Sequence, residues 1–237
     1  AVDLKKALSQ VLLAASLDTS RVEINAVNFN FINGNLVLAA TDSYRLAERK
    51  IKIDNNNERD LIIPLKTVQE LSRILNENHS EKLSIYFNEN QIMFVFENVE
   101  LISRVIDSKY PDYQQIIPQE FVTTGVCDKK DLVPAIKSVA LFCKQGINDI
   151  RVSIDSKNQE LIITTASSGT GNSVAKVPAK VTGHDNDIVF NYRYLLDGLN
   201  NMDDNEVIIK INNNSSPGLI QPIKNQDYIY LVMPIRQ

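Results

Sequence analysis

Apolar residues return along the chain with a spacing of three and four at four places. Such spacing puts them on one face of an α-helix and leaves polar residues on the other. The pattern predicts helices over residues 3–16, 66–77, 131–144 and 191–201. In the first of these, the apolar face is formed by Leu4, Leu8, Val11, Leu12 and Ala15.

Between the helices, apolar and polar residues alternate instead, which is typical of strands with one buried face. The alternation begins at residues 22–32, pauses at Asn33-Gly34 and resumes at Leu36, so it predicts a β-hairpin with a tight turn. Further strands are predicted at 36–41, 47–53, 61–64, 83–87, 91–96, 100–106, 150–154, 160–165, 175–177, 188–190, 207–211, 219–222 and 228–233.

The order of elements begins again near residue 121. The clearest internal match sets residues 60–71 against 187–199, where a buried strand leads into the second helix of each half. Two copies of one unit, each with two helices and six or more strands, predict an α+β fold in which the helices pack on antiparallel sheets. We expect the domains to span 1–119 and 120–237.

The composition of the chain restricts the class of protein that it can be. The chain is 43% hydrophobic and 23% charged, with a net charge of −4, so a protein that coats nucleic acid over its whole surface is not expected. The apolar runs are far shorter than the ~20 residues of a membrane span, and we expect a soluble, cytoplasmic protein. Cys127 and Cys143 lie outside any metal-binding motif. No metal and no cofactor is expected.

The charge is unevenly distributed. The predicted helices, with flanking residues at 128–130 and 145, hold nine basic and six acidic residues, a net of +3, while the rest of the chain carries −7. One explanation is a local positive surface that attracts phosphates. Solvated lysines on amphipathic helices explain the uneven charge equally well.

No catalytic constellation is evident. Thr41, Asp42, Ser43 and Arg45 could suggest a hydrolase or transferase, but neither His79 nor His184 lies in a motif that would supply a base. A turn held by Asp and Thr side chains is the simpler interpretation. Gly169-Thr-Gly171 lacks the lysine of a phosphate loop, and Asp203-Asp204 is better explained as a polar loop than as a metal site.

Four phrases resemble the bacterial sliding clamp family, the β subunit of the replicative DNA polymerase III. They are Thr41-Asp-Ser-Tyr-Arg-Leu-Ala, Tyr110-Pro-Asp-Tyr-Gln-Gln-Ile-Ile-Pro, Asn191-Tyr-Arg-Tyr-Leu-Leu and Tyr230-Leu-Val-Met-Pro-Ile-Arg-Gln. Their order resembles the family's second and third domains, which implies that the first domain is not among these residues. Family members form a ring-shaped homodimer around duplex DNA and have no catalytic activity of their own.

The resemblance implies a peptide-binding groove between the two domains. Its wall would comprise Ile24, Thr41, Ser43, Tyr44, Arg45, Leu46, Pro111, Gln115, Ile116, Ile147, Asn191, Tyr194, Ser216, Leu231, Val232, Met233, Pro234, Ile235 and Arg236. The apolar members would form a slot, and the polar members would orient a peptide backbone or a glutamine side chain. We expect Leu46→Asp to abolish peptide binding without unfolding the chain.

The resemblance also implies partners. Double-stranded DNA would lie against the helices, contacted without sequence preference by Lys5, Lys6, Lys66, Arg73, Lys129, Lys130, Lys137 and Arg193. The groove would bind the polymerase III alpha subunit, the clamp loader delta subunit and other proteins with the same motif. Ser43-Tyr44, Gln115 and Gln237 depart from the common family residues. The rival hypothesis is an adaptor of the same fold that binds no DNA.

Overall fold

The structure is a computed structural model that describes the chain except residues 55–56, 78–81, 144–145, 168–170 and 237. It divides into two compact units, Ala1–Asp112 and Tyr113–Gln237, called unit 1 and unit 2 below. In the described part of the chain, no helix is long and apolar enough to cross a membrane.

Unit 1 consists of a helix pair and two antiparallel sheets. Strands β4, β1, β2 and β3 are neighbours in that order, and β5, β6 and β7 form a separate three-stranded sheet. The elements are α1 Val2–Leu12, β1 Ala26–Ile32, β2 Asn35–Thr41, β3 Arg45–Lys52, β4 Arg59–Pro64, α2 Leu65–Glu77, β5 Ser84–Phe87, β6 Gln91–Phe96 and β7 Val99–Arg104.

Unit 2 repeats this plan with one more strand. Its strands follow the order β12, β9, β10, β11, β8, β13, β14 and β15, and each neighbouring pair is antiparallel. The elements are η1 Tyr113–Ile116, β8 Thr123–Asp128, α3 Lys129–Ala140, β9 Asp149–Asp155, β10 Glu160–Ser167, β11 Gly171–Thr182, β12 Asn186–Asn191, α4 Tyr192–Asn200, β13 Glu206–Ile211, β14 Gly218–Pro222 and β15 Tyr228–Val232.

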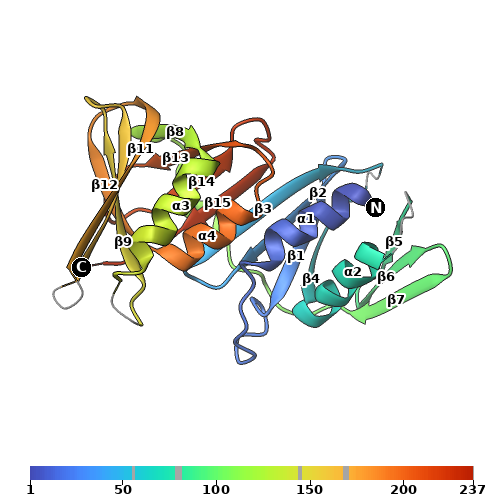
Figure 1. The fold of residues 1–237 in the computed structure, drawn as a ribbon. Coiled ribbons are helices and arrows are strands. Elements are labelled where there is room, and N and C mark those ends of the chain that lie inside the picture. Colours follow the sequence, from blue (N-terminus) through green and yellow to red (C-terminus); the bar gives the residue numbers. More distant parts are fainter. Residues whose placement is uncertain (55–56, 78–81, 144–145, 168–170, 237) are drawn as a thin grey trace. The chain divides into compact units, whose positions relative to one another are not determined.

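The helices cover the sheets through the faces that the sequence predicts. In α1, the residues Leu4, Leu8 and Val11 are buried, and in α3 the same holds for Leu132 and Ile136. Within each unit the two helices lie side by side over the sheet (Figure 1). The predicted fold class, two α+β copies with helices packed on antiparallel sheets, is confirmed.

The hairpin turn is also as predicted. Asn33 and Gly34 have φ angles of 49° and 69°, and Ile32 pairs with Asn35 across the turn. Positive φ at both central residues is the conformation of the two-residue turns that match the twist of antiparallel strands.

The predicted ends of two helices need correction. The helix predicted over 3–16 ends at Leu12, and the one predicted over 131–144 ends at Ala140, with Lys144 outside the described residues. After both ends the backbone tightens into i to i−3 bonds, from Ala14 to Val11 (3.0 Å) and from Phe142 to Val139 (3.0 Å). Apolar periodicity continues through such a turn, so the sequence pattern overestimates the helix.

Strand β8 is not among the strands that the sequence pattern predicts. Its buried positions are Thr123, Gly125 and Cys127, which are small and only weakly apolar. A Cβ atom at Gly125 would lie 3.0 Å from the Leu161 side chain, so little room exists for a larger residue. The signal for β8 was therefore an alternation of small residues, not of hydrophobic ones. Strand β11 is likewise longer than the predicted residues 175–177.

Candidate functional site

In unit 1, the predicted groove residues concentrate on the turn between β2 and β3. The Thr41 hydroxyl donates to the Arg45 carbonyl (2.7 Å) and accepts from the Ser43 amide (3.1 Å). Asp42 accepts bonds from the amides of Tyr44 and Arg45, each at 2.9 Å, and from Arg45 Nε at 3.0 Å. These bonds hold Ser43 at a positive φ of 78° and leave Tyr44 62% exposed.

The same bonds distinguish a catalytic site at Thr41 to Arg45 from a turn that is held by Asp and Thr side chains. The Asp42 carboxylate is fully engaged by donors of its own turn, and its ion pair with Arg45 has both side chains largely shielded from solvent. A carboxylate held in this way braces the turn and is not placed to act as a general base. The predicted turn chemistry is confirmed.

Ile24 joins this region through Arg21. The Arg21 guanidinium donates to the Ser43 hydroxyl (2.8 Å), and the Ile24 amide donates to the Arg21 carbonyl (3.1 Å). Arg21 lies outside the family phrases and is not among the predicted site residues. Pro111, the remaining unit 1 residue of the set, is half-buried and follows the buried Tyr110. Burial raises the pKa of the Tyr110 hydroxyl far above its usual value of 10.

In unit 2, other predicted residues gather at the start of α4. Asn191 caps this helix by accepting a bond from the Arg193 amide (3.0 Å). The Tyr192 amide donates to the Asn148 carbonyl (2.9 Å), which brings the chain next to Ile147 close to the helix start. The C-terminal run lies beside β12, because the Ile235 amide donates to the Val189 carbonyl (2.8 Å).

Tyr194 is fixed by a residue of β15. The buried Tyr230 hydroxyl donates to the Tyr194 carbonyl (2.9 Å), and its ring lies so close to α4 that a Cβ atom at Gly198 would be 2.4 Å from two ring atoms. A glycine inside a short helix was the sequence signal for this contact. This signal does not enter the sequence-based prediction.

Three further unit 2 positions lie outside the strands and α-helices. Ser216 belongs to the loop before β14, where its amide donates to Asn213 Oδ1 (2.8 Å). Gln115 and Ile116 lie on η1 and are exposed.

Burial divides the predicted groove residues into two classes. Ile24, Leu46, Leu231 and Val232 are almost fully buried, with Leu46 only 1% exposed. A carboxylate at such a position would be desolvated without a partner, so Leu46→Asp is expected to destabilise the fold, contrary to the sequence-based expectation. Ile116 (41%) and Ile147 (44%) are exposed and can carry a charge without this cost.

The helices carry positive charge within an acidic chain. With the observed helix bounds, they hold eight basic and five acidic residues, a net of +3 against −4 for the whole chain. All eight predicted DNA-facing residues are at least partly exposed: Lys5, Lys6, Lys66, Arg73, Lys129, Lys130, Lys137 and Arg193.

These cations differ in their local partners. Arg73 pairs with Glu70 (2.6 Å), Lys130 pairs with Asp128 (3.4 Å), and Lys129 donates to the Met202 carbonyl. Lys66 and Lys137 are exposed, and within the described residues neither forms an ion pair. Both lysines are therefore placed to attract an external anion.

The other candidate sites have simpler structural roles. Asp204 accepts a bond from the Lys224 amide (2.7 Å), as expected of a polar loop. Of the loop Gly169-Thr-Gly171, the first two residues lie outside the described part of the chain. Among the described residues, no cluster of three or more His, Cys, Asp or Glu side chains is arranged to hold a metal ion.

Comparison with known proteins agrees with the division into two units. The family model for the DNA polymerase III beta subunit, central domain, matches residues 1–112, and the model for the C-terminal domain of the same subunit matches residues 114–236. The beta sliding clamp of Synechococcus elongatus is 32% identical over 235 residues, which are 97% of this chain. That of Bacillus subtilis is 32% identical over 237 residues.

Solved structures show the same similarity. The DNA polymerase sliding clamp from Bacillus subtilis superposes with a TM-score of 0.92 at 30% identity, covering 99% of this chain and 62% of the other. The DNA polymerase III beta subunit from Thermotoga maritima gives a TM-score of 0.94 at 27% identity, covering 99% and 63%. The chain spans about 62% of the length of the relatives that it matches. Because both family models match along nearly its whole length, the chain belongs to the DNA polymerase III beta subunit family.

Proposed function

We propose that the chain is part of a DNA sliding clamp, a non-catalytic processivity factor that tethers the bacterial replicative polymerase to duplex DNA in the cytoplasm. The observation that carries the proposal is membership of the beta subunit family over both units. The protein that contains this chain would close a ring-shaped homodimer around the DNA.

The positive helices would supply the contact with DNA. Their net charge of +3 is modest, and exposed lysines on helix surfaces reach phosphates without reading base edges. Such contacts give weak, salt-sensitive binding without sequence preference. Weak contacts suit a ring that must slide, because retention on the DNA then depends on closure of the ring and not on affinity.

The groove residues would recruit partners. The turn at Thr41 to Leu46, the start of α4 and the C-terminal run would bind a short extended peptide of the type Gln-x-x-Leu-x-Phe. Polymerase III alpha subunit, clamp loader delta subunit and other proteins with this motif would supply the peptide. A short peptide loses conformational entropy on binding, so we expect an affinity of roughly 1 μM. The ring and the DNA tether add avidity.

The test is a fluorescence-anisotropy titration of the labelled peptide against the chain and two variants. Ile147→Asp places a charge beside the start of α4 at an exposed position, and we expect it to weaken binding about tenfold. Leu17→Asp is the matched control, since Leu17 is 80% exposed and lies outside the groove residues, and its affinity should stay unchanged. A folded chain that binds neither the peptide nor DNA would contradict the proposal and favour the adaptor hypothesis.

A further inference from the structure

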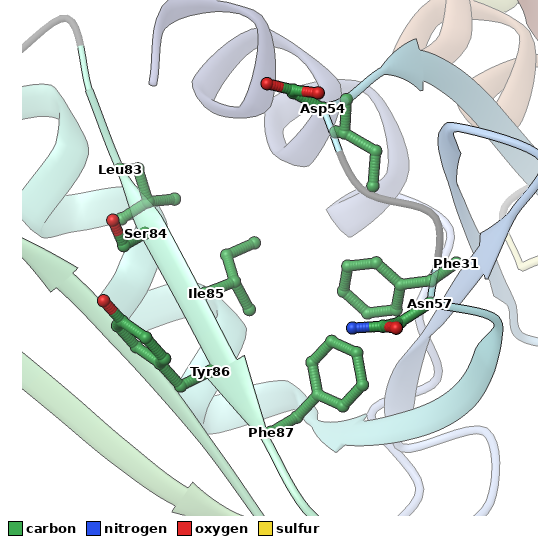
Figure 2. Close-up of a pocket in the computed structure, with 9 residues that line it drawn as sticks. Phe31, Asp54, Asn57, Leu83, Ser84, Ile85, Tyr86 and Phe87 are labelled. Atoms are coloured by element: carbon green, nitrogen blue, oxygen red, sulfur yellow. The ribbon is translucent and has the colours of Figure 1, made fainter.

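The sheet of β5, β6 and β7 in unit 1 turns one face to the interior of the unit. Figure 2 shows Phe87 on the side of β5 that meets Phe31, while Tyr86 points the other way. The rings of Phe31 and Phe87 lie 4.8 Å apart, and those of Phe29 and Phe94 lie 6.1 Å apart. Because successive side chains of a strand point to opposite faces, the residues between these form an outer face.

An apolar row crosses the outer face through all three strands. Tyr86 on β5 is opposite Met93 on β6, which in turn is opposite Ile102 on β7. Tyr86 is 56% exposed, Ile102 is 58% exposed, and Met93 is partly exposed. These three residues, called the outer row below, form an exposed apolar stripe on a sheet face where polar residues are the rule.

Unlike charges lie on the two sides of the outer row. On β7, Glu100 comes two residues before Ile102 and Arg104 two residues after it, so each lies about 7 Å from Ile102 on the same face. Glu100 and Arg104 are exposed, and within the described residues neither forms an ion pair. The other carboxylates nearby, Glu89 and Glu97, lie in the turns at the ends of β6, where solvent screens them.

The shape of the face also differs between the two sides of the outer row. A hollow of about 210 Å³ is bordered by the outer row together with Asn88 and Gln91, and Gln91 is opposite Arg104. On the other side of the row, Val95 is opposite Glu100 and is partly exposed. One side therefore offers an opening, and the other side offers an apolar side chain.

We propose that the outer face of β5 to β7 binds the same face of a second copy of the chain, around a two-fold axis that runs along the outer row. Interfaces of this symmetry are self-complementary, so a residue before the row meets a residue after it. Glu100 of each copy would then lie against Arg104 of the other, and Val95 of each copy against the hollow of the other. The strands of the two sheets would stay aligned, as in packed antiparallel sheets.

The charge pattern selects this occupant. A partner of uniform charge, such as a nucleic acid, would attract one of the two charged residues and repel the other. The same face turned around the two-fold axis supplies the opposite charge at both places. The proposal is independent of the proposed clamp function.

The size of the face sets the strength of the contact. Three strands about 4.8 Å apart, each with about five residues, cover roughly 14 by 17 Å, or ~240 Å² per copy. A stable interface buries about 800 Å² per partner, so the contact is weak. We expect a dissociation constant of roughly 1 mM, and association only at high local concentration.

The test follows the ¹⁵N-labelled full chain by NMR at low salt, from about 0.05 to about 2 mM. The amide signals of Tyr86, Met93 and Ile102 should shift with concentration. Glu100→Arg and Arg104→Glu, each alone, place like charges against each other at both contacts and should weaken association at least about tenfold. Both variants should fold, because the two side chains are exposed.

The decisive sample mixes the two variants in equal amounts. Glu100→Arg then supplies two positive groups and Arg104→Glu two negative groups, so the mixed pair regains unlike charges at both contacts. The shifts should return in the mixture to the extent seen in the unchanged chain. Glu120→Arg is the matched control, since Glu120 is exposed in unit 2 and the charge change is the same, and its association should stay unchanged.

Three results would overturn the proposal. They are constant signals in the unchanged chain up to about 2 mM, single variants that associate as well as the unchanged chain, and a mixture that does not regain association. A loss in Glu120→Arg equal to that in Glu100→Arg would do so as well, because it indicates an effect of net charge. Peptide and DNA binding are not read out, so failure here leaves the clamp proposal intact.

Discussion

Removal of Lys66 and Lys137 tests whether the helices contact DNA. Both side chains are exposed on helices, Lys66 on α2 and Lys137 on α3, and neither has an ion-pair partner within the described residues. By contrast, Arg73 and Lys130 already pair with carboxylates of the chain. The double variant Lys66→Ala/Lys137→Ala therefore removes two exposed cations that no carboxylate of the described chain pairs with.

The expected magnitude follows from counterion release. Each phosphate contact contributes about 0.9 to the slope of log K against log salt concentration, so two lost contacts should reduce that slope by about 1.8. When salt rises from 50 to 200 mM, DNA binding by the double variant should therefore weaken about 12-fold less than DNA binding by the unchanged chain. Because Lys66 and Lys137 contact no other part of the fold through an ion pair in the described chain, stability should change by no more than about 0.5 kcal/mol.

The assay is a titration of a labelled duplex at several salt concentrations, with Lys180→Ala as the matched control. Lys180 is exposed on β11, but the neighbouring Ala179 is buried on the face that α3 covers. Successive side chains of a strand point to opposite faces, so Lys180 lies on the side away from the helices. Its removal should leave the slope unchanged. An unchanged slope in the double variant, or an equal change in Lys180→Ala, would refute the assignment of the helix face to DNA.

Two further predictions concern stability. Gly198→Ala places a Cβ atom 2.4 Å from the buried Tyr230 ring, so we expect a cost of about 1–3 kcal/mol in the free energy of unfolding from urea titration, and an unchanged midpoint would contradict the contact. Burial raises the pKa of the Cys127 thiol to about 12 from 9.0, so folding disfavours the thiolate and stability falls as pH rises above 9. Between pH 9 and 10.5 the chain should lose about 1 kcal/mol per pH unit more than Cys127→Ala, and equal losses in urea titrations of both would contradict the shift.

The sequence alone determined the helices, the first hairpin and the two-copy organisation. Apolar spacing places Leu4, Leu8 and Val11 on one helix face whatever the neighbours are, and Asn33-Gly34 tolerates the positive φ angles that the turn requires. The phrase around Thr41 also indicated a braced turn, because Asp and Thr bond to backbone groups only a few residues away. Local interactions within a few residues carry all of these features.

Tertiary structure decided the rest, because it depends on residues distant in sequence. Leu46 belongs to a family phrase that predicts a groove residue, but its side chain is only 1% exposed. Strand β8 is invisible to hydrophobic patterning, since its small buried residues are set by the Leu161 side chain that packs against Gly125.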